Sequence, residues 1–272
     1  MTTTLPAPAT APARPGPTGR RGAPLRDVAT MTRREARRSL RSVDSLINAF
    51  ALPVLIMSVF VVIFGGAISG PGGGYIDYVV PGVLVMCLGM NSGSAAVAVA
   101  QDMTSGTIDR FKTLPIFSSS ALWGHVFASV VRNLASAALV VLVAVAYGFR
   151  PGAALGDWLG FAAFAVLAVL TFTWISVTLG LVLSVEASMS VNMIFLFVPY
   201  LSSGFVAVET MPAWLHGFAE HQPFTPVIES VRGLLAGAPD AGTILTACAW
   251  LGGLLLASVL AGGVLYRRRT AR

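Results

Sequence analysis

Six long apolar stretches alternate with short polar segments along this chain. They cover residues 46–68, 78–100, a third stretch that ends at Phe149, and residues 158–185, 189–208 and 241–266. The hydrocarbon core of a bilayer is about 30 Å thick, and a helix needs about 20 residues to cross it. The pattern therefore predicts an all-α, polytopic membrane protein whose six transmembrane helices occupy residues 46–266.

The composition indicates the same class of protein. Of the 272 residues, 55% are hydrophobic and 11% are charged, and the mean hydropathy is +0.77. Soluble domains carry about 25% charged residues, so a large soluble domain is excluded. Cys87 and Cys248 both lie within apolar stretches, where we expect them to pack against neighbouring helices.

The basic residues are distributed unequally between the polar segments. Fifteen of the 18 lie before the first stretch, between the second and third (Arg110 and Lys112), or after the last. Arg150 and Arg232 lie on the other side, and Arg132 lies within the third stretch. By the positive-inside rule, both termini and residues 101–118 are expected in the cytoplasm, with the chain in the cell membrane. Membrane topology thus accounts for the net charge of +6 without nucleic acid as a partner.

The N-terminal region divides in two. Residues 1–24 are rich in Pro, Ala, Thr and Gly and are expected to be disordered. Residues 25–45 predict an amphipathic helix, since apolar residues recur there at helical spacing. Such a helix would lie on cytoplasmic lipid, and a solvated charged linker is the alternative. The arginines of this predicted interfacial helix are Arg33, Arg34, Arg37, Arg38 and Arg41. Residues 267–272 form a second basic segment, predicted to be a cytoplasmic tail.

A charged segment, residues 101–118, separates the second and third apolar stretches. A helix here would place Ile108, Phe111 and Leu114 on one side, and Pro115 would end it. A small helix with one apolar face can dock into a groove of a soluble partner. The alternative is an amphipathic connector on the membrane surface.

The third stretch is expected to start irregularly, over residues 118–131, because it carries His125 and Arg132. An arginine at the bilayer centre costs about 2.5–3.5 kcal/mol. We therefore expect Arg132 to face other helices as a structural anchor, with a substrate contact as the alternative. His125 is expected at the membrane interface.

Polar residues and prolines inside the apolar stretches are candidates for a substrate pathway. Asp and Glu are missing from the middle of every stretch, so proton or sodium coupling has no evident residues. A mostly apolar pathway for a lipid-like molecule is expected, although each candidate also has a helix-packing explanation. The candidates are Pro53, Asn91, Pro199, Tyr200, Ser202 and Ser203.

Residues 209–240 are too polar to span a membrane, and they predict an extracellular hairpin of two short, half-buried helices that re-enter or line the outer leaflet. A packed cap on the bundle and a direct contact with the substrate are the alternative roles for this hairpin. Thr210 is expected to cap the first and Thr225 the second, with Pro226 at its first position. The second helix is predicted to be amphipathic. Its apolar face would contain Val227, Ile228, Val231, Leu234 and Leu235.

Several kinds of chemistry are absent from the sequence. The only lysine, Lys112, follows Phe111, so no Gly-Lys-Ser/Thr phosphate loop exists and any ATP must be bound by another polypeptide. Ser92 could be read as the centre of an intramembrane serine protease, but no histidine deep in another stretch could activate it. The spacing of Gly89 and Gly93 instead favours close helix packing. An autonomous, ATP-independent carrier or channel is a further alternative.

Three segments carry a resemblance to a known family. They are VVPGVLVM at residues 79–86, GTIDRFKTLPI at 106–116 and VETMPAWLHGFAEHQPFTPVIESVRGLL at 208–235. With six predicted spans and no nucleotide site, the chain resembles an ABC-2 type permease, most closely the daunorubicin-resistance drug-export branch. The resemblance implies the six-helix, type V exporter-like permease fold.

The resemblance also implies a half-transporter. Two permease copies would pair and sit on two copies of a separate ABC ATPase that binds ATP and Mg²⁺, while this chain holds no cofactor and exports a hydrophobic drug, antibiotic or lipid-like molecule. Gln101 and Thr104 stand where the family often has glutamates. The implied ATPase-coupling residues are Asp102, Gly106, Thr107, Ile108, Asp109, Arg110, Phe111 and Lys112.

Overall fold

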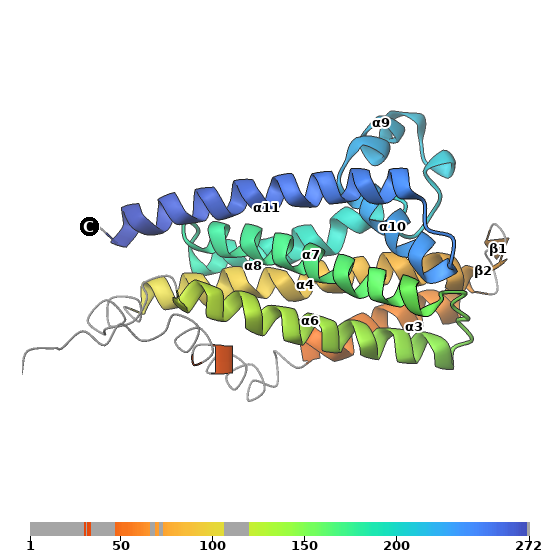
Figure 1. The fold of residues 1–272 in the computed structure, drawn as a ribbon, viewed down its shortest axis with the longest axis horizontal. Coiled ribbons are helices and arrows are strands. Elements are labelled where there is room, and N and C mark those ends of the chain that lie inside the picture. The colour runs from red at the N-terminus through yellow and green to blue at the C-terminus, as the bar shows by residue number, and fades with distance from the viewer. Residues whose placement is uncertain are drawn as a thin grey trace, which may run out of the picture.

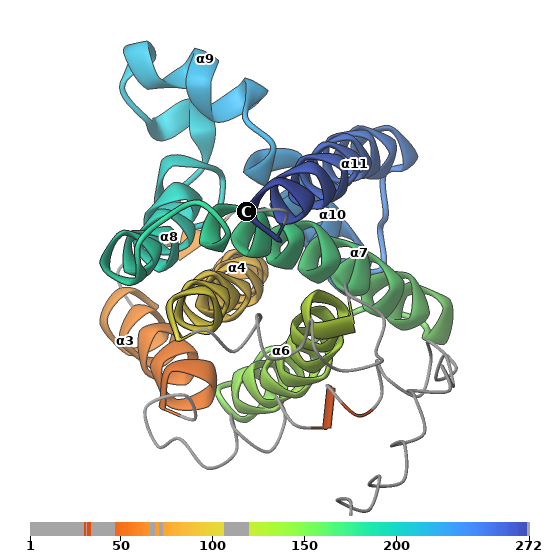
Figure 2. The ribbon, with the colours of Figure 1, turned by 90° about the vertical axis from the view of Figure 1, so that its left-hand side faces the viewer.

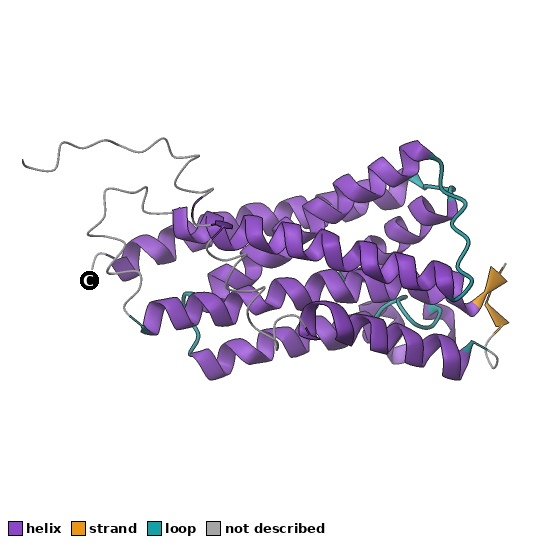
Figure 3. Ribbon diagram, turned by 90° about the horizontal axis from the view of Figure 1, so that it is seen from below, coloured by secondary structure: helices purple, strands orange, loops and turns teal. Residues whose placement is uncertain are grey.

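The computed structural model describes residues 30, 32–33, 47–65, 69–70, 73–105 and 120–270, which form an elongated bundle of helices (Figures 1 and 3). In chain order the elements are the π-helix η1 (Ile47–Ala51), α3 (Leu52–Phe64), the strands β1 (Ser69–Gly70) and β2 (Gly73–Gly74), α4 (Tyr75–Thr104), α6 (Ser120–Ala146), α7 (Leu155–Gly180), α8 (Val185–Phe197), the 3₁₀ turns η2 (Val198–Leu201) and η3 (Val208–Thr210), α9 (Ala213–His221), α10 (Phe224–Ala236) and α11 (Ala241–Thr270). The strands pair as a small antiparallel hairpin between α3 and α4.

Within the described part of the chain, four helices are long and apolar enough to cross a membrane. These are Tyr75–Thr104, Trp123–Ala146, Leu155–Gly180 and Ala241–Arg269. The first and fifth predicted spans are shorter in the structure, as the apolar helices Ala49–Ile63 and Val185–Leu201. The chain is therefore a mostly helical, multi-pass membrane protein within its described residues.

The fifth predicted span, residues 189–208, is wrong as one continuous helix. α8 begins earlier, at Val185, and the α-helix gives way to η2 at Val198. Pro199 lies in the first turn of η2 and has no N–H to donate to the carbonyl four residues before it, so the α-helix cannot continue. The Ser202 hydroxyl then donates to the Pro199 carbonyl at 2.7 Å, which stabilises the turn.

Two other predicted boundaries also differ. The irregular start predicted for the third stretch is wrong from Ser120 onward, because α6 runs unbroken from Ser120 to Ala146. The connection between the fourth and fifth predicted stretches, 158–185 and 189–208, lies earlier than predicted, between Gly180 and Val185. Ser184 caps α8 by accepting a hydrogen bond from the Ala187 N–H at 3.2 Å.

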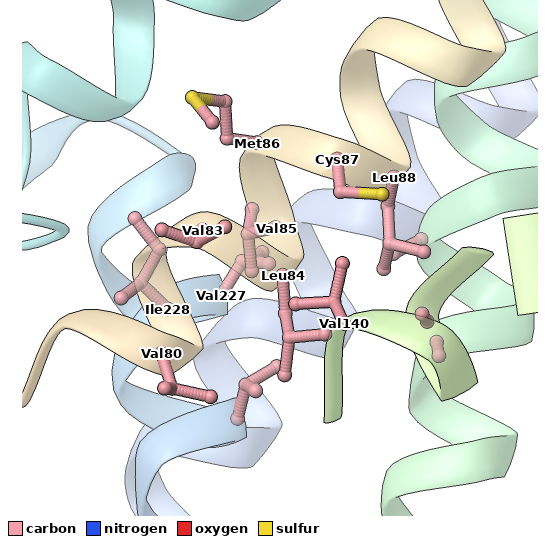
Figure 4. Packing of buried hydrophobic residues seen from close by; sticks show 14 of the residues in the cluster. Val80, Val83, Leu84, Val85, Met86, Cys87, Leu88, Val140, Val227 and Ile228 are labelled. Carbon is pink, nitrogen blue, oxygen red and sulfur yellow. The ribbon is translucent and has the colours of Figure 1, made fainter. Parts of the chain in front are cut away.

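α4 is the central helix of the bundle. Viewed along the bundle, it is surrounded by α3, α6, α7 and α8 (Figure 2). Its residues from Val79 to Gly93 are all buried, as expected for a helix that is apolar on every side. Its side chains meet Val140 of α6 and both Val227 and Ile228 of α10 (Figure 4).

Glycines let other segments approach α4 closely. A Cβ at Gly89 would meet the Phe195 ring, and one at Gly93 would overlap the Asn192 side chain. Both neighbours belong to α8, so the close packing predicted from the Gly89 and Gly93 spacing is confirmed, with α8 as the partner. A Cβ at Gly82 would overlap the Gly204 carbonyl of the loop after η2.

Both helices predicted within residues 209–240 exist, but their predicted caps are wrong. Pro212 and Pro223 occupy the N-cap positions of α9 and α10. Thr210 lies in η3, and the Thr225 hydroxyl donates to the Ala219 carbonyl at 2.5 Å. The predicted apolar face of α10 is confirmed, because all five of its residues are buried.

The two ends of the bundle differ in their chemistry. One end, called the basic end here, gathers the C-terminal end of α4, the start of α6, the α7–α8 turn and Arg267–Arg269 of α11 (Figure 1). The opposite end carries the β1–β2 hairpin, α10, Arg150 and Arg232. At this opposite end Asp240 caps α11, and hydrogen bonds from the Thr243 hydroxyl and N–H hold the pKa of its carboxyl below the ordinary value.

Candidate coupling end and substrate pathway

Most of the predicted coupling segment lies outside the described residues. This applies to Gly106, Thr107, Ile108, Asp109, Arg110, Phe111 and Lys112, and to Arg34, Arg37, Arg38 and Arg41 of the predicted interfacial helix. Arg33 is described and exposed. The structure does describe both points where the segment joins the bundle, namely the end of α4 and the start of α6.

A buried acid–histidine pair joins α4 to α6 at the basic end. Nε2 of His125 lies 3.1 Å from Oδ2 of Asp102, and the two side chains are 6% and 7% exposed. The His125 side chain therefore faces the interior of the bundle, while its expected depth at the membrane interface stays a prediction. Asp102 directs its carboxylate into the bundle, which favours a role in holding α4 to α6 over direct contact with a soluble partner.

An apolar layer surrounds this pair. Val99 of α4, Val126 of α6, Val177 of α7 and Tyr266 of α11 belong to one buried cluster. At its edge Trp123 packs edge-on against Trp174, with ring centroids 5.3 Å apart. The basic end is thus a packed platform of four helices, close to Ser105 and Ser120, the last and first described residues on either side of the predicted coupling segment.

A polar network crosses the middle of the bundle, with Arg132 at its centre. One Arg132 nitrogen, Nη2, donates to the Asn91 carbonyl at 2.8 Å and to the Ser94 hydroxyl at 2.7 Å. Asn91 Nδ2 in turn donates to the Ala49 carbonyl at 3.2 Å, and Ser136 donates to the same oxygen. The network ties η1, α4 and α6 together, as expected of Arg132 in the role of a structural anchor.

Ser92 lies beside this network, and among the described residues no catalytic base contacts its hydroxyl. It is fully buried, and its hydroxyl donates to the Leu88 carbonyl at 2.7 Å. Its other described contact is Asn133 Nδ2, at 3.4 Å. An amide cannot take the proton from a serine, so the protease alternative finds no support in this geometry.

At the opposite end, Arg232 links α10 to α4 and to the loop after η2. Its Nη2 donates to the Ser203 carbonyl at 2.8 Å and to the Tyr78 carbonyl at 3.1 Å. The guanidinium carbon lies 4.0 Å from the centre of the Tyr78 ring, and the Tyr78 hydroxyl donates to the Ser203 carbonyl at 2.9 Å. Glu229 forms an ion pair with Arg232. The loop is therefore held to α4 by its backbone.

Aromatic rings close the space between α3 and this loop. Tyr200 stacks on Phe205 with centroids 4.3 Å apart, and Phe60 of α3 lies 4.6 Å from Phe205. Rings in such offset or tilted contacts contribute about 0.5–1.5 kcal/mol beyond their burial. The rings of α3, η2 and the following loop thus form one aromatic group near the N-terminal end of α4, where the Tyr75 hydroxyl reaches the Phe205 carbonyl.

Comparison with known proteins identifies the family. The sequence profile described as ABC-2 type transporter matches residues 26–236. The chain belongs to the ABC-2 type transporter family. It is 30% identical over 214 residues to the daunorubicin resistance ABC transporter permease protein DrrB1 of Streptomyces coeruleorubidus, covering 76% of this chain and 75% of that protein. It is 23% identical over 254 residues to the probable doxorubicin resistance ABC transporter permease protein DrrC of Mycobacterium tuberculosis, covering 87% of each.

The six predicted pathway residues of this ABC-2 protein fall into two groups. Asn91 belongs to the Arg132 network, and Pro53 lies in the first turn of α3, directly after η1, which that network reaches at Ala49. The other group, Pro199, Tyr200, Ser202 and Ser203, forms the η2 turn and its loop. The structure does not bring the six together into one site, and Ser202 and Ser203 are buried.

Sequence reasoning missed two pairings in the ABC-2 protein. Asp102 lies near the end of α4 and His125 near the start of α6, and these helices are antiparallel and consecutive in the chain. Because both residues are a few positions from the connecting segment, the sequence could have predicted that they lie at the same level. The contact of Arg232 with Tyr78 joins residues 154 positions apart, and a single sequence holds no local signal for it.

Proposed function

We propose that this chain is the permease subunit of an ATP-driven exporter that moves a hydrophobic drug, antibiotic or lipid-like molecule out of the cell. Two copies of this chain form a dimer in the cell membrane. Each copy crosses the membrane six times, through four long and two shorter helices, and has both termini in the cytoplasm. Two copies of a separate ABC ATPase bind and hydrolyse ATP with Mg²⁺, and this chain holds no cofactor of its own.

The observation that carries the proposal is the 30% identity to a permease named for daunorubicin resistance, over three quarters of both chains. The sequence adds a physical constraint. Because the only lysine cannot belong to a phosphate loop, ATP binding requires a second polypeptide.

The arrangement of the basic end supports coupling through residues 106–112. The segment joins α4 and α6, and the pair Asp102–His125 connects these two helices only a few residues from the segment's ends. A displacement of the segment would therefore pass directly into α4, which contacts α3, α6, α7, α8 and α10. A movement of residues 106–112 would thereby displace α4, the central helix of the bundle.

The opposite end supports a role for the η2 loop in substrate passage. Pro199 interrupts the helix, and the loop is attached to α4 through backbone contacts with Tyr78 and Arg232. Tyr200 and Ser203 are the residues of this loop that we propose to meet the substrate.

The coupling assignment is tested by co-expressing the chain with its cognate ATPase and reconstituting the complex in liposomes. Phe111→Ala and Arg110→Glu are expected to lower both ATP-dependent daunorubicin transport and co-purification of the ATPase, while membrane insertion is retained. Ser118→Ala, in the same connecting segment but outside the proposed contact, is the matched control and should keep both.

Two results would contradict the proposal in different ways. Full transport and full ATPase binding in both variants would remove residues 110 and 111 from the coupling contact. Flux through liposomes that contain the purified chain alone, without ATP, would identify an autonomous carrier or channel.

A further inference from the structure

An apolar cavity lies on the side of the bundle away from α3 and α6. Its volume is about 130 Å³, and α7, α8, α10 and α11 all contribute to its wall. Every side chain that lines it is apolar. The residues that define it best are Phe172, Ile175, Val191, Phe195, Phe224 and Leu254.

Three aromatic rings form the inner wall of this cavity. Phe172 of α7 stacks on Phe224 at the start of α10, with centroids 5.4 Å apart and planes 6° apart. Phe195 of α8 lies 5.2 Å from Phe172. Phe172 and Phe195 are buried, and their mutual contacts fix the rings in place, so the wall is already formed without a ligand.

The cavity opens sideways, toward the surrounding bilayer. α8 and α11 stand on either side of α7 (Figure 2), and the cavity lies between them. Two of its lining residues, Ile194 and Leu179, are 56% and 36% exposed on the bundle surface. A ligand can therefore enter from the membrane without passing through water.

The depth of the cavity determines what can reach it. Leu254 precedes Tyr266 by 12 residues, which is about 18 Å of helix at 1.5 Å per residue. The arginines that follow Tyr266 belong at the membrane surface, and the middle of a bilayer core lies about 15 Å below that surface. At this depth the surrounding solvent consists of hydrocarbon chains.

We propose that this cavity binds the terminal part of one acyl chain of a bilayer lipid, held between α8 and α11. An apolar cavity of about 150 Å³ stays dry and takes up benzene, so this one matches a short hydrocarbon segment and is too small for a four-ring drug. Its wall offers no hydrogen-bonding group to the polar atoms of such a drug. The inference requires only that the chain spans a membrane, and it is independent of ATP coupling and of the exported molecule.

A photoreactive lipid tests the proposal. The full-length chain is reconstituted in vesicles of phosphatidylcholine and phosphatidylglycerol that contain a little phosphatidylcholine with a diazirine at the end of one acyl chain. After irradiation, mass spectrometry is expected to find label concentrated on α8 around Val191–Phe195 and on α11 around Leu251–Leu254. A lipid with the diazirine on its headgroup should leave these positions unlabelled.

Filling the cavity should remove the label. Val191→Phe places a ring in the space that the chain end would occupy and should lower labelling there by about tenfold, the factor that corresponds to 1.4 kcal/mol. Met193→Phe is the matched control, because Met193 lies on the same helix but is 53% exposed outside the cavity, and its labelling should stay unchanged. Leu254→Trp fills the cavity from α11 and replaces Val191→Phe if that variant fails to fold, as judged by size-exclusion chromatography.

Two outcomes would overturn the proposal. Label spread evenly over the exposed surfaces of α6, α8 and α11 would show that the cavity holds no chain preferentially. Loss of label on addition of daunorubicin would show that the cavity belongs to a drug site. Neither outcome depends on the ATPase, so neither outcome tests the proposed transport function.

Discussion

α4 and α11 are similar in sequence character and opposite in their surroundings. Both are 30 residues long, and the most apolar 18-residue segments of the two helices are similarly hydrophobic. In α4, 83% of this segment is buried inside the bundle, but in α11 only 11% is buried. The helix with the slightly more apolar segment is thus the one that faces outward. Lipid tails are as apolar as a protein core, so hydropathy alone does not decide which helix becomes central.

The two helices differ in how they use small and polar residues. In α4, Gly82, Gly89 and Gly93 each touch another segment, and Asn91 joins two neighbouring helices. In α11, Gly252 and Gly253 have open space where a Cβ would lie. Large apolar residues such as Leu245, Leu256 and Leu260 are exposed there. Contact between segments distinguishes the two helices, and it can be changed residue by residue.

The largest effect is expected for Gly82→Ala. The added Cβ would overlap the Gly204 carbonyl, and because both groups belong to the backbone, neither can move aside cheaply. We expect a loss of about 1–3 kcal/mol, the usual cost of overpacking, seen as a lower apparent Tm of the detergent-solubilised protein. The matched control is Gly253→Ala in α11, which should stay within about 0.5 kcal/mol of the original chain. Equal effects of the two substitutions would mean that α4 and α11 tolerate side chains alike.

Arg132→Met comes next, because it removes the donor that connects α6 to the Asn91 carbonyl and the Ser94 hydroxyl of α4. The expected loss is about 1.5 kcal/mol, the lower end of the range for hydrogen bonds made by a charged group, measured by unfolding in mixed micelles. Arg132→Lys keeps the charge but loses the planar guanidinium. Its stability should lie between that of the original chain and that of Arg132→Met. Unchanged stability of Arg132→Met together with lost transport would identify Arg132 as a substrate contact instead of an anchor.

Smaller effects are expected where α7 holds α11. The Thr178 hydroxyl donates to the Ser258 carbonyl at 2.9 Å. The Thr171 hydroxyl shares its one hydrogen between the Leu167 carbonyl of its own helix, at 2.9 Å, and the Leu251 carbonyl of α11, at 3.1 Å. Thr171→Val and Thr178→Val should each cost about 0.6 kcal/mol, the average for such bonds between membrane helices, in the same unfolding assay. A loss as large as that of Gly82→Ala would show that α11 is held as firmly as α4.

The smallest effect is expected at Asp240, which caps α11. Because hydrogen bonds from Thr243 hold the pKa of this carboxyl below its ordinary value, the stability it contributes is complete above about pH 4 and is lost as the pH falls through the folded-state pKa. Asp240→Asn keeps a capping oxygen but does not titrate. The apparent Tm of Asp240→Asn should fall less between pH 5 and pH 3 than that of the original chain. Identical pH profiles of the two proteins would show that the Asp240 cap does not cause the loss of stability at low pH.

Local features of the fold followed from the sequence because they depend on residues close together in the chain. The apolar face of α10 was predicted from five positions at helical spacing, and all five are buried. The glycine spacing in α4 predicted close packing, although α8 as the partner was not predicted. The predicted caps at Thr210 and Thr225 are wrong because a proline occupies the N-cap position of each helix. The two threonine hydroxyls donate instead to the Ala207 and Ala219 carbonyls.

By itself, the sequence determined that the chain is a helical membrane protein, which segments are apolar, that a phosphate loop is absent and which family the motifs resemble. Each of these depends on composition or on short-range order. Only the tertiary structure decided that α4 is central and α11 peripheral, that Asp102 turns inward to His125, and that Arg232 holds the loop after η2. These contacts join residues from 23 to 154 positions apart, and such pairs form only when packing brings their helices together.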